Sequence, residues 1–369
     1  MNSLGLLDVA AVVLASTGAL LLIVLVALRI RRQVRHARAE RAAEPYRARL
    51  LELLCAEGDD RERVLGTLAE LDDRSWTALE PVARTFLGKV TGQASGSLVE
   101  LFERRGLAER AMADLERPGR PRRARAAETL GRLRHQAAAP RLLPLLQDPD
   151  PDVRVVAAKA LGRIGDPSAV PALLAALHGP HPIPPPVVVL SLTELGPDSQ
   201  PAVAAGLDAR QPLVRAVAVE ALGAVGATAW APRIALALTA DPHPEVQIRA
   251  ARALGALGTP PAADPLLDAL KSSRPAPLRA VAAGALGRLG DPGMAWRLGE
   301  LLDDPVPRVA ATAARSMARL GQAGEWELRR AQGGIHGERA ARHAEAALAE
   351  AAISKGRTRS ASRDPAADR

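Results

Sequence analysis

The feature that most constrains this chain is a short signature, Leu-Gly-x-Ile/Leu-Gly, which returns at a nearly constant interval. The leucine position of the signature is occupied in turn by Leu130, Leu161, Leu192, Leu222, Leu254, Leu286 and, with a substitution, Met317. Successive members lie 30 to 32 residues apart. Chance alanine-rich helices would not keep this register over about 190 residues, so the sequence predicts an array of repeats.

One complete repeat occupies residues 148–178 and has the pattern of a helical hairpin. Its apolar residues Val153, Val156, Ala157, Ala160, Leu161 and Ile164 follow the spacing of an amphipathic helix. Asp150 and Pro151 suit the start of that helix, and Gly165 suits its end. A second apolar helix follows with Val170, Leu173, Leu174 and Leu177.

The composition favours closely spaced helices over an ordinary globular core. Aromatic residues make up only 2% of the chain, and strand patterns are nearly absent. The interior must therefore be built from Ala, Leu and Val, as in stacked helical pairs. We predict an all-α fold, an α-solenoid of about seven helical hairpins.

The repeated sequence pattern resembles the HEAT-repeat family, in particular the short HEAT-like repeats of phycobilisome lyases. The pattern is D-P-x-x-x-V-R-x-x-A-A-x-A-L-G-x-I-G-D-P. The resemblance covers roughly residues 116–333. It implies that the Arg after the first Val joins an intramolecular polar ladder. The matching residues here are Arg123, Arg154, Arg215 and Arg279, and the Arg is replaced at Pro185, Gln247 and Ala310.

The segments outside the array are predicted from their composition. We expect a short extracytoplasmic N-terminus over 1–8, a transmembrane helix over 9–28, a basic juxtamembrane helix over 29–49, a helical region and solenoid cap over 50–115, the repeat array over 116–333, a capping helix over 334–353 and a disordered basic tail over 354–369. Within the array, the proline-rich segment 180–186 predicts a weakly packed third repeat.

Residues 9–28 form an uncharged apolar run that is long enough, as a helix, to span a bilayer. The basic residues that follow, among them Arg29, Arg31, Arg32 and Arg35, predict a membrane-interface segment on the cytoplasmic side. A single-pass protein with its N-terminus outside and its repeats in the cytoplasm is therefore expected. A cleaved signal peptide and a long buried helix are the alternatives.

The net charge of +8 comes from the ends of the chain, because the juxtamembrane and tail segments are basic and residues 50–351 are neutral. A neutral array without a groove that combines basic and aromatic residues argues against nucleic-acid binding as a function of the repeats. The chain also lacks the spacing of known catalytic, metal-binding or phosphate-binding motifs. We therefore expect no catalytic site, metal, cofactor or small-molecule ligand.

The second helices of three repeats carry Trp230, Trp296 and Trp326, four, six and five residues after the terminal glycine of the first helix. Tryptophan is common at the energetic centres of protein interfaces, so these residues are the predicted partner-binding positions. Because the three tryptophans differ in register, packing of their side chains against neighbouring helices remains the alternative.

The functional hypothesis is a non-catalytic, membrane-anchored scaffold that binds a protein partner, such as a membrane enzyme, on its cytoplasmic side. The lipid bilayer is the second expected partner, through residues 9–28. One alternative is an enzyme resembling the HEAT-repeat bilin lyases. Another is nucleic-acid binding through the basic end segments.

Overall fold

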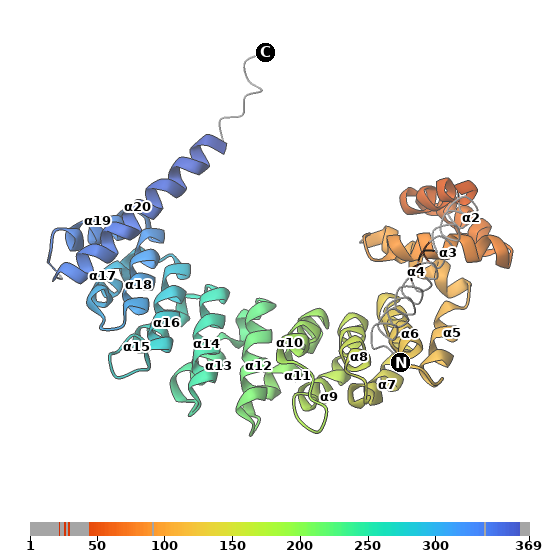
Figure 1. The fold of residues 1–369 in the computed structure, drawn as a ribbon, viewed down its shortest axis with the longest axis horizontal. Helices are drawn as coiled ribbons and strands as arrows, with labels where there is room; N and C mark the ends of the chain where they lie inside the picture. Colours follow the sequence, from red (N-terminus) through yellow and green to blue (C-terminus); the bar gives the residue numbers. More distant parts are fainter. Residues whose placement is uncertain are drawn as a thin grey trace, which may run out of the picture. The chain divides into compact units, whose positions relative to one another are not determined.

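A computed structural model of the chain describes residues 44–90, 92–335 and 337–361, together with Leu22, Val26 and Arg29. These residues form helices and turns, and no strand occurs among them. The chain divides into two compact units, Met1–Ala111 and Met112–Arg369. Figure 1 labels the helices in chain order. The predicted all-α class is confirmed for the described residues.

The first unit is a small helical region with an aromatic centre. Its helices are residues 44–55, α2 (Gly58–Ala69), α3 (Asp73–Leu87), α4 (Gly92–Arg104) and α5 (Leu107–Leu115), which crosses the unit boundary. The Asp72 side chain accepts hydrogen bonds from the backbone N–H groups of Arg74 and Ser75 and so begins α3. Trp76 of α3 packs edge-on against Phe102 of α4, with 5.7 Å between the ring centroids.

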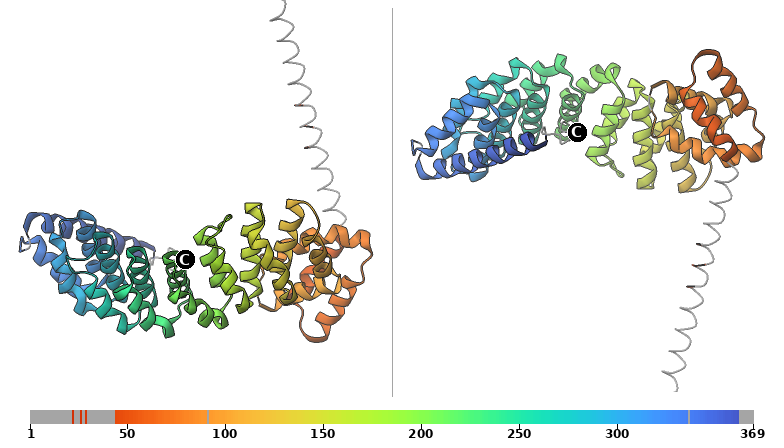
Figure 2. Two further views of the ribbon diagram at one scale, coloured as in Figure 1. Left: turned by 90° about the horizontal axis from the view of Figure 1, so that it is seen from below. Right: turned by 90° about the horizontal axis from the view of Figure 1, so that it is seen from above.

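The second unit contains the repeats, and each repeat contributes one long first helix. The first helices are α6 (Arg120–Arg132), α8 (Pro151–Ile164), α10 (Pro185–Glu194), α12 (Pro212–Ala224), α14 (Pro244–Leu257), α16 (Ala276–Leu289) and α18 (Pro307–Arg319). Each packs against the next along the chain. Figure 2 shows them side by side in a row. The predicted solenoid is therefore confirmed.

The second helices are shorter, and most begin with a turn of 3₁₀ helix. They are α7 (Ala139–Leu142), α9 (Val170–Ala175), α11 (Gln200–Ala205), α13 (Ala231–Ala240), α15 (Ala263–Asp268), α17 (Ala295–Gly299) and α19 (Gly321–Gln332). Their buried leucines, such as Leu173 and Leu298, face the first helices and complete the core. The pattern of paired helices agrees with the predicted hairpin.

Proline and glycine delimit the first helices as the sequence predicts. Four first helices begin at the recurring proline, namely α8, α12, α14 and α18. Proline is tolerated there because the first turn of a helix does not use its N–H group. Gly165, Gly258 and Gly290 end α8, α14 and α16 with φ angles of 82°, 66° and 73°, in the left-handed region that glycine adopts without strain.

A different glycine, the first in the signature, sets how closely the first helices approach. It occurs at Gly131, Gly162, Gly223, Gly255 and Gly287. A Cβ atom added to Gly223 would lie 2.6 Å from the Cβ of Ala253 in the next first helix. A side chain would therefore push the helices apart, and glycine is required for this spacing.

The Arg ladder implied by the HEAT resemblance is present at three joints between repeats. Arg123 pairs with Asp148, Arg215 with Asp241, and Arg279 with Asp304, each through two nitrogen–oxygen contacts. In each pair the Asp belongs to the turn before the next first helix, where it also accepts a backbone N–H two residues ahead. The pair thus connects consecutive repeats.

The joint between Arg215 and Asp241 has the clearest electrostatic consequence. Burial alone raises the pKa of Asp241, but the hydrogen bonds from Arg215 and from the His243 N–H, together with the charge of Arg215, outweigh it and lower the pKa below the usual 3.8. The same pair raises the pKa of Arg215, mainly through the side-chain hydrogen bond to Asp241. The two side chains retain only 13% and 6% of their exposure.

The ladder is interrupted in the middle of the array. Arg154 donates to the carbonyl oxygens of Asp148 and Pro149 and has no carboxylate partner among the described residues. Gln247 makes a similar bond to the carbonyl of Asp241. In the third repeat, α10 begins after the prolines and spans ten residues, fewer than the other first helices.

The membrane localisation predicted from the sequence is wrong on the evidence of the described helices. None of them is long and apolar enough to cross a bilayer. The longest, α20 (Gly337–Ala361), carries charged residues such as Glu338, Arg339 and Arg342, which would be costly in hydrocarbon. The predicted span 9–28 lies outside the described residues except for Leu22 and Val26.

Helix α20 follows the last hairpin, where the capping helix is expected. It packs against α18 and α19, with Ala340, Ala344 and Ala347 buried at helical spacing. It continues to Ala361 and therefore enters the segment predicted to be disordered. Basic residues near a helix C-terminus favour this continuation because they interact well with the helix dipole.

Candidate functional site

Trp296 and Trp326 lie on neighbouring second helices of the last two repeats. Trp296 belongs to α17 and Trp326 to α19, and these helices pack against each other. Each tryptophan precedes a fully buried leucine, Leu298 or Leu328, by two residues. The two side chains therefore occupy the same position on their helices, a correspondence that counting from the terminal glycines does not reveal.

Both rings are exposed rather than packed into the core. Trp296 retains 51% of its exposure and Trp326 58%, whereas Trp76 of the first unit retains 2%. Exposed indoles on adjacent helices present a large apolar area to solvent, which is a common property of binding surfaces. We refer to Trp296 and Trp326 as the tryptophan pair.

An arginine lies over each ring of the pair. The guanidinium carbon of Arg297 is 3.9 Å from the centroid of Trp296, and that of Arg330 is 4.6 Å from the centroid of Trp326. Arg330 also donates to Glu327. Cation–π contacts of this kind contribute about 0.5–1 kcal/mol at exposed sites. They hold the rings in defined orientations before any partner binds.

Trp230 does not join the pair. It ends the 3₁₀ turn before α13, four residues before the buried Ile234, and its side chain is half-buried. Helix α13 packs against α14 and α15, two elements of the neighbouring repeat. Of the three predicted tryptophans, the structure thus brings together two.

A hollow of about 640 Å³ adjoins the tryptophan pair. It lies between α15 and α17 and is lined by residues of both signs, including Asp264, Asp268, Lys271, Arg297, Glu300 and Asp303. Arg297 connects it to the pair because the same side chain covers Trp296. Hydrogen bonds from Lys271 and Arg274 lower the pKa of Asp268 and keep it ionised.

The lining of this hollow does not resemble a metal site. Throughout the part of the chain that the structure describes, no three His, Cys, Asp or Glu side chains are placed to hold a metal ion. The carboxylate of Asp268 is occupied by two cations of its own chain. Mixed charges beside exposed indoles are suited to recognising a protein surface.

Of the predicted membrane-interface residues, the structure describes one. Arg29 is exposed, and Arg31, Arg32 and Arg35 lie outside the described residues.

Comparison with known families identifies the repeats. The family model described as HEAT repeats matches residues 112–184, 200–286 and 263–352. No curated protein matches the chain.

Several solved structures resemble the fold. The complex of CpcE and CpcF of phycocyanin lyase from Nostoc sp. PCC7120 is 27% identical, covering 60% of this chain and 92% of that chain with a TM-score of 0.32. A mutant of Kap121p is 13% identical, covering 79% and 39% with a TM-score of 0.50. Human deoxyhypusine hydroxylase in complex with glycerol is 20% identical, covering 70% and 96% with a TM-score of 0.31.

The regions matched by the family model contain the paired helices from α6 to α19, apart from α10, and span more than half of the chain. The close glycine contacts and the Arg–Asp joints account for the recurring residues of the match. The chain therefore belongs to the HEAT-repeat family.

Proposed function

We propose that this HEAT-repeat solenoid is a non-catalytic scaffold whose last repeats bind a protein partner. The observation that supports the proposal is the tryptophan pair, two indoles more than half exposed on packed helices. Large aromatic side chains contribute much of the energy in protein interfaces because they bury a large area with little loss of conformational entropy.

The adjoining hollow supports the same function. It offers carboxylates and basic groups next to the indoles, so a partner can combine an apolar contact with hydrogen bonds around its edge. A membrane enzyme is not the expected partner, because that expectation depended on a membrane localisation that the described helices contradict.

Affinity capture tests the proposal with a double variant, Trp296→Ala/Trp326→Ala. Proteins retained by the parent chain are compared quantitatively with those retained by the variant. We expect recovery of the partner to fall by about tenfold or more, since loss of a single interface hot spot costs about 2 kcal/mol. Both side chains are exposed, so the thermal midpoint of the variant should stay close to that of the parent.

Trp230→Ala is the matched control, because it removes the same type of side chain from a second helix outside the pair. It should retain the partner. Equal recovery by the parent and the double variant would disprove the role of the pair, as would the absence of any specifically retained protein.

A further inference from the structure

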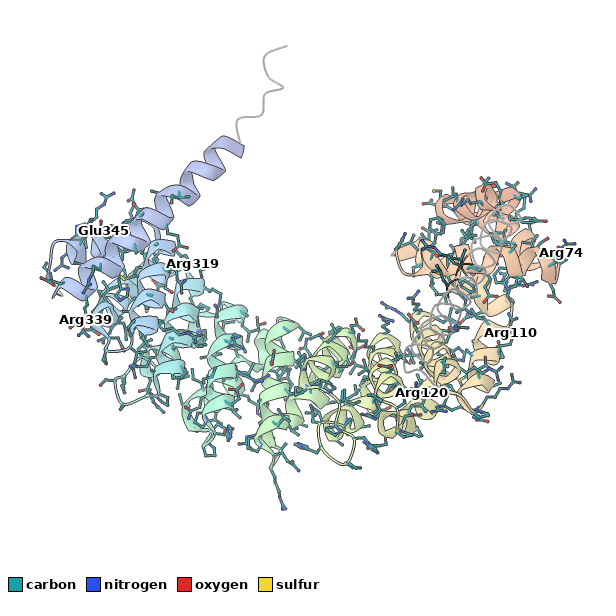
Figure 3. The ribbon with its side chains drawn as sticks, viewed as in Figure 1. Arg74, Arg110, Arg120, Arg319, Arg339 and Glu345 are labelled. Atoms are coloured by element: carbon teal, nitrogen blue, oxygen red, sulfur yellow. The ribbon has the colours of Figure 1, made fainter. Side chains whose placement is uncertain are left out.

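The first helices of the last repeats carry a group of arginines without acidic partners. They are Arg252 of α14, Arg288 of α16, and Arg315 and Arg319 of α18, and all four residues are exposed. Among the residues that the structure describes, none of the four forms an ion pair. Arg319 is labelled in Figure 3. We call these four residues the arginine face.

The position shared by Arg288 and Arg319, two residues after the leucine position of the signature, is neutralised where earlier repeats carry an arginine there. Arg132, Arg163 and Arg288 each directly follow the glycine that contacts the next helix. Arg132 pairs with Glu128, and Arg163 lies 3.8 Å from Glu194. At Arg288 no described carboxylate takes this place. At the position after the contact glycine, the unpaired arginine is therefore a property of the last repeats.

Arg288 is the most constrained member of the arginine face. Its Nε lies 3.4 Å from the carbonyl oxygen of Gly255, so the side chain crosses from α16 onto α14. Partial burial lowers its pKa, and the like charges of Arg319 and Arg252 lower it further. Three guanidinium groups therefore repel one another on a rigid surface, and a bound anion would relieve that repulsion.

The helix surface beside Arg252 is hollowed, because small residues line it. A hollow of about 220 Å³ between α12 and α14 is lined by small residues, Gly223, Ala224, Ala253 and Ala256, and by three charged ones, Arg252 and the ion-paired Glu220 and Arg249. On α16, Gly284 has no side chain, and an added Cβ would be in ordinary van der Waals contact with Thr312, 3.6 Å from its Cγ2. A bound segment could thus bring its backbone near the helices while its side chains reach the arginines.

We propose that the arginine face binds an acidic segment of a partner protein. Arginine favours carboxylates because its planar group can donate two parallel hydrogen bonds. The first helices α6 to α18 contain no aromatic residue, so this face lacks the rings on which single-stranded nucleic acids stack. Charge complementarity without stacking residues favours an acidic peptide.

The helix spacing indicates the pattern of acidic residues in the segment. Packed helices lie roughly 8–10 Å apart, and an extended chain advances about 3.3 Å per residue. Arginines on consecutive first helices therefore match carboxylates about three residues apart. The proposal is independent of the tryptophan pair, which lies on second helices.

Binding of a fluorescent peptide by the full chain tests the proposal. The probe is a peptide of about twelve residues with Glu at every third position, followed by fluorescence anisotropy. Each exposed ion pair contributes about 0.2–1 kcal/mol, so Arg252→Gln/Arg319→Gln should weaken binding roughly five- to tenfold. Arg288 is left unchanged because it packs over Gly255.

The matched control is Arg132→Gln/Arg163→Gln, which removes the same charge from first helices of earlier repeats. It should bind the peptide as the parent does. Equal weakening by both variants, or no binding by the parent, would overturn the proposal.

Two further measurements distinguish the arginine face from a nucleic-acid surface and from the tryptophan pair. A single-stranded DNA oligonucleotide of the same charge should bind more weakly than the peptide, and tighter binding would overturn the choice of a protein ligand. Trp296→Ala/Trp326→Ala should leave peptide binding unchanged. Loss of peptide binding in that variant would overturn the proposal and assign the peptide to the tryptophan pair instead.

Discussion

The joint between α12 and α14 and the joint between α10 and α12 connect repeats of the same family by different means. At the first, Gly223 lies against Ala253 and Arg215 pairs with Asp241. At the second, Thr193 stands where five other repeats have the contact glycine, and the positions of the Arg and Asp are taken by Pro185 and Ala209.

Both joints nevertheless keep the signature leucines of successive first helices stacked in the core, which we call the leucine column. Leu192 of α10 and Leu222 of α12 are almost fully buried. The apolar stripe is therefore sufficient to stack the repeats in register. The close glycine contact and the ion pair are additional features that stabilise particular joints.

The largest expected effect comes from breaking the ion pair at the α12–α14 joint. Arg215→Met leaves the buried Asp241 carboxylate without its partner, which should lower the free energy of unfolding by about 3 kcal/mol. Urea denaturation followed by circular dichroism measures it. Arg154→Met is the control, because Arg154 bonds only to backbone carbonyls, and about 1–2 kcal/mol is expected. Equal losses would show that the carboxylate pairing adds nothing.

A smaller effect is expected from crowding the helix contact. In Gly223→Ala the new Cβ would lie 2.6 Å from that of Ala253, so the helices must separate, at a cost of about 1–3 kcal/mol. The matched control is Gly66→Ala, because Gly66 lies inside α2 with open space around it. There alanine should stabilise the chain by up to about 1 kcal/mol. A stabilised Gly223→Ala variant would contradict the packing role of that glycine.

The smallest effect is a change in acid sensitivity. Because the pKa of Asp241 is lowered in the folded chain, its contribution to stability is present above the unfolded pKa of about 3.9 and is lost as the pH falls through the lower folded value. Asp241→Asn removes the titrating group. Its thermal midpoint should therefore fall less steeply than that of the parent below about pH 4. Parallel curves for the two proteins would contradict this assignment.

The fold was largely predictable because the repeat spacing and the helix-delimiting residues are local signals. Pro151 and Gly165 act within their own helix, and the structure places them at its two ends. The contact role of Gly162 was not predicted, although its recurrence beside the leucine column is visible in the sequence. Only the structure shows that the neighbouring helix reaches this residue.

The candidate site was less predictable, since exposure depends on how the short second helices are oriented. Trp296 and Trp326 differ in distance from the preceding glycine, yet both occupy the same position relative to a buried leucine. The 3₁₀ turns before the second helices vary. The number of residues after the glycine therefore does not indicate which side of the second helix a residue occupies. The missing acidic partners of Arg288 and Arg319 likewise depend on contacts between helices.

The Arg–Asp pairs also make the stability of each joint depend on which two repeats are neighbours. Each pair takes its Arg from one repeat and its Asp from a turn 25 or 26 residues later. The residue at the corresponding distance from Arg154 is Gly179, which has no carboxylate. If the repeat that begins at Asp241 directly followed the repeat that contains Arg154, its aspartate would supply this carboxylate. A rearranged order of repeats would therefore keep the ion pair only where the following repeat places an aspartate at this distance.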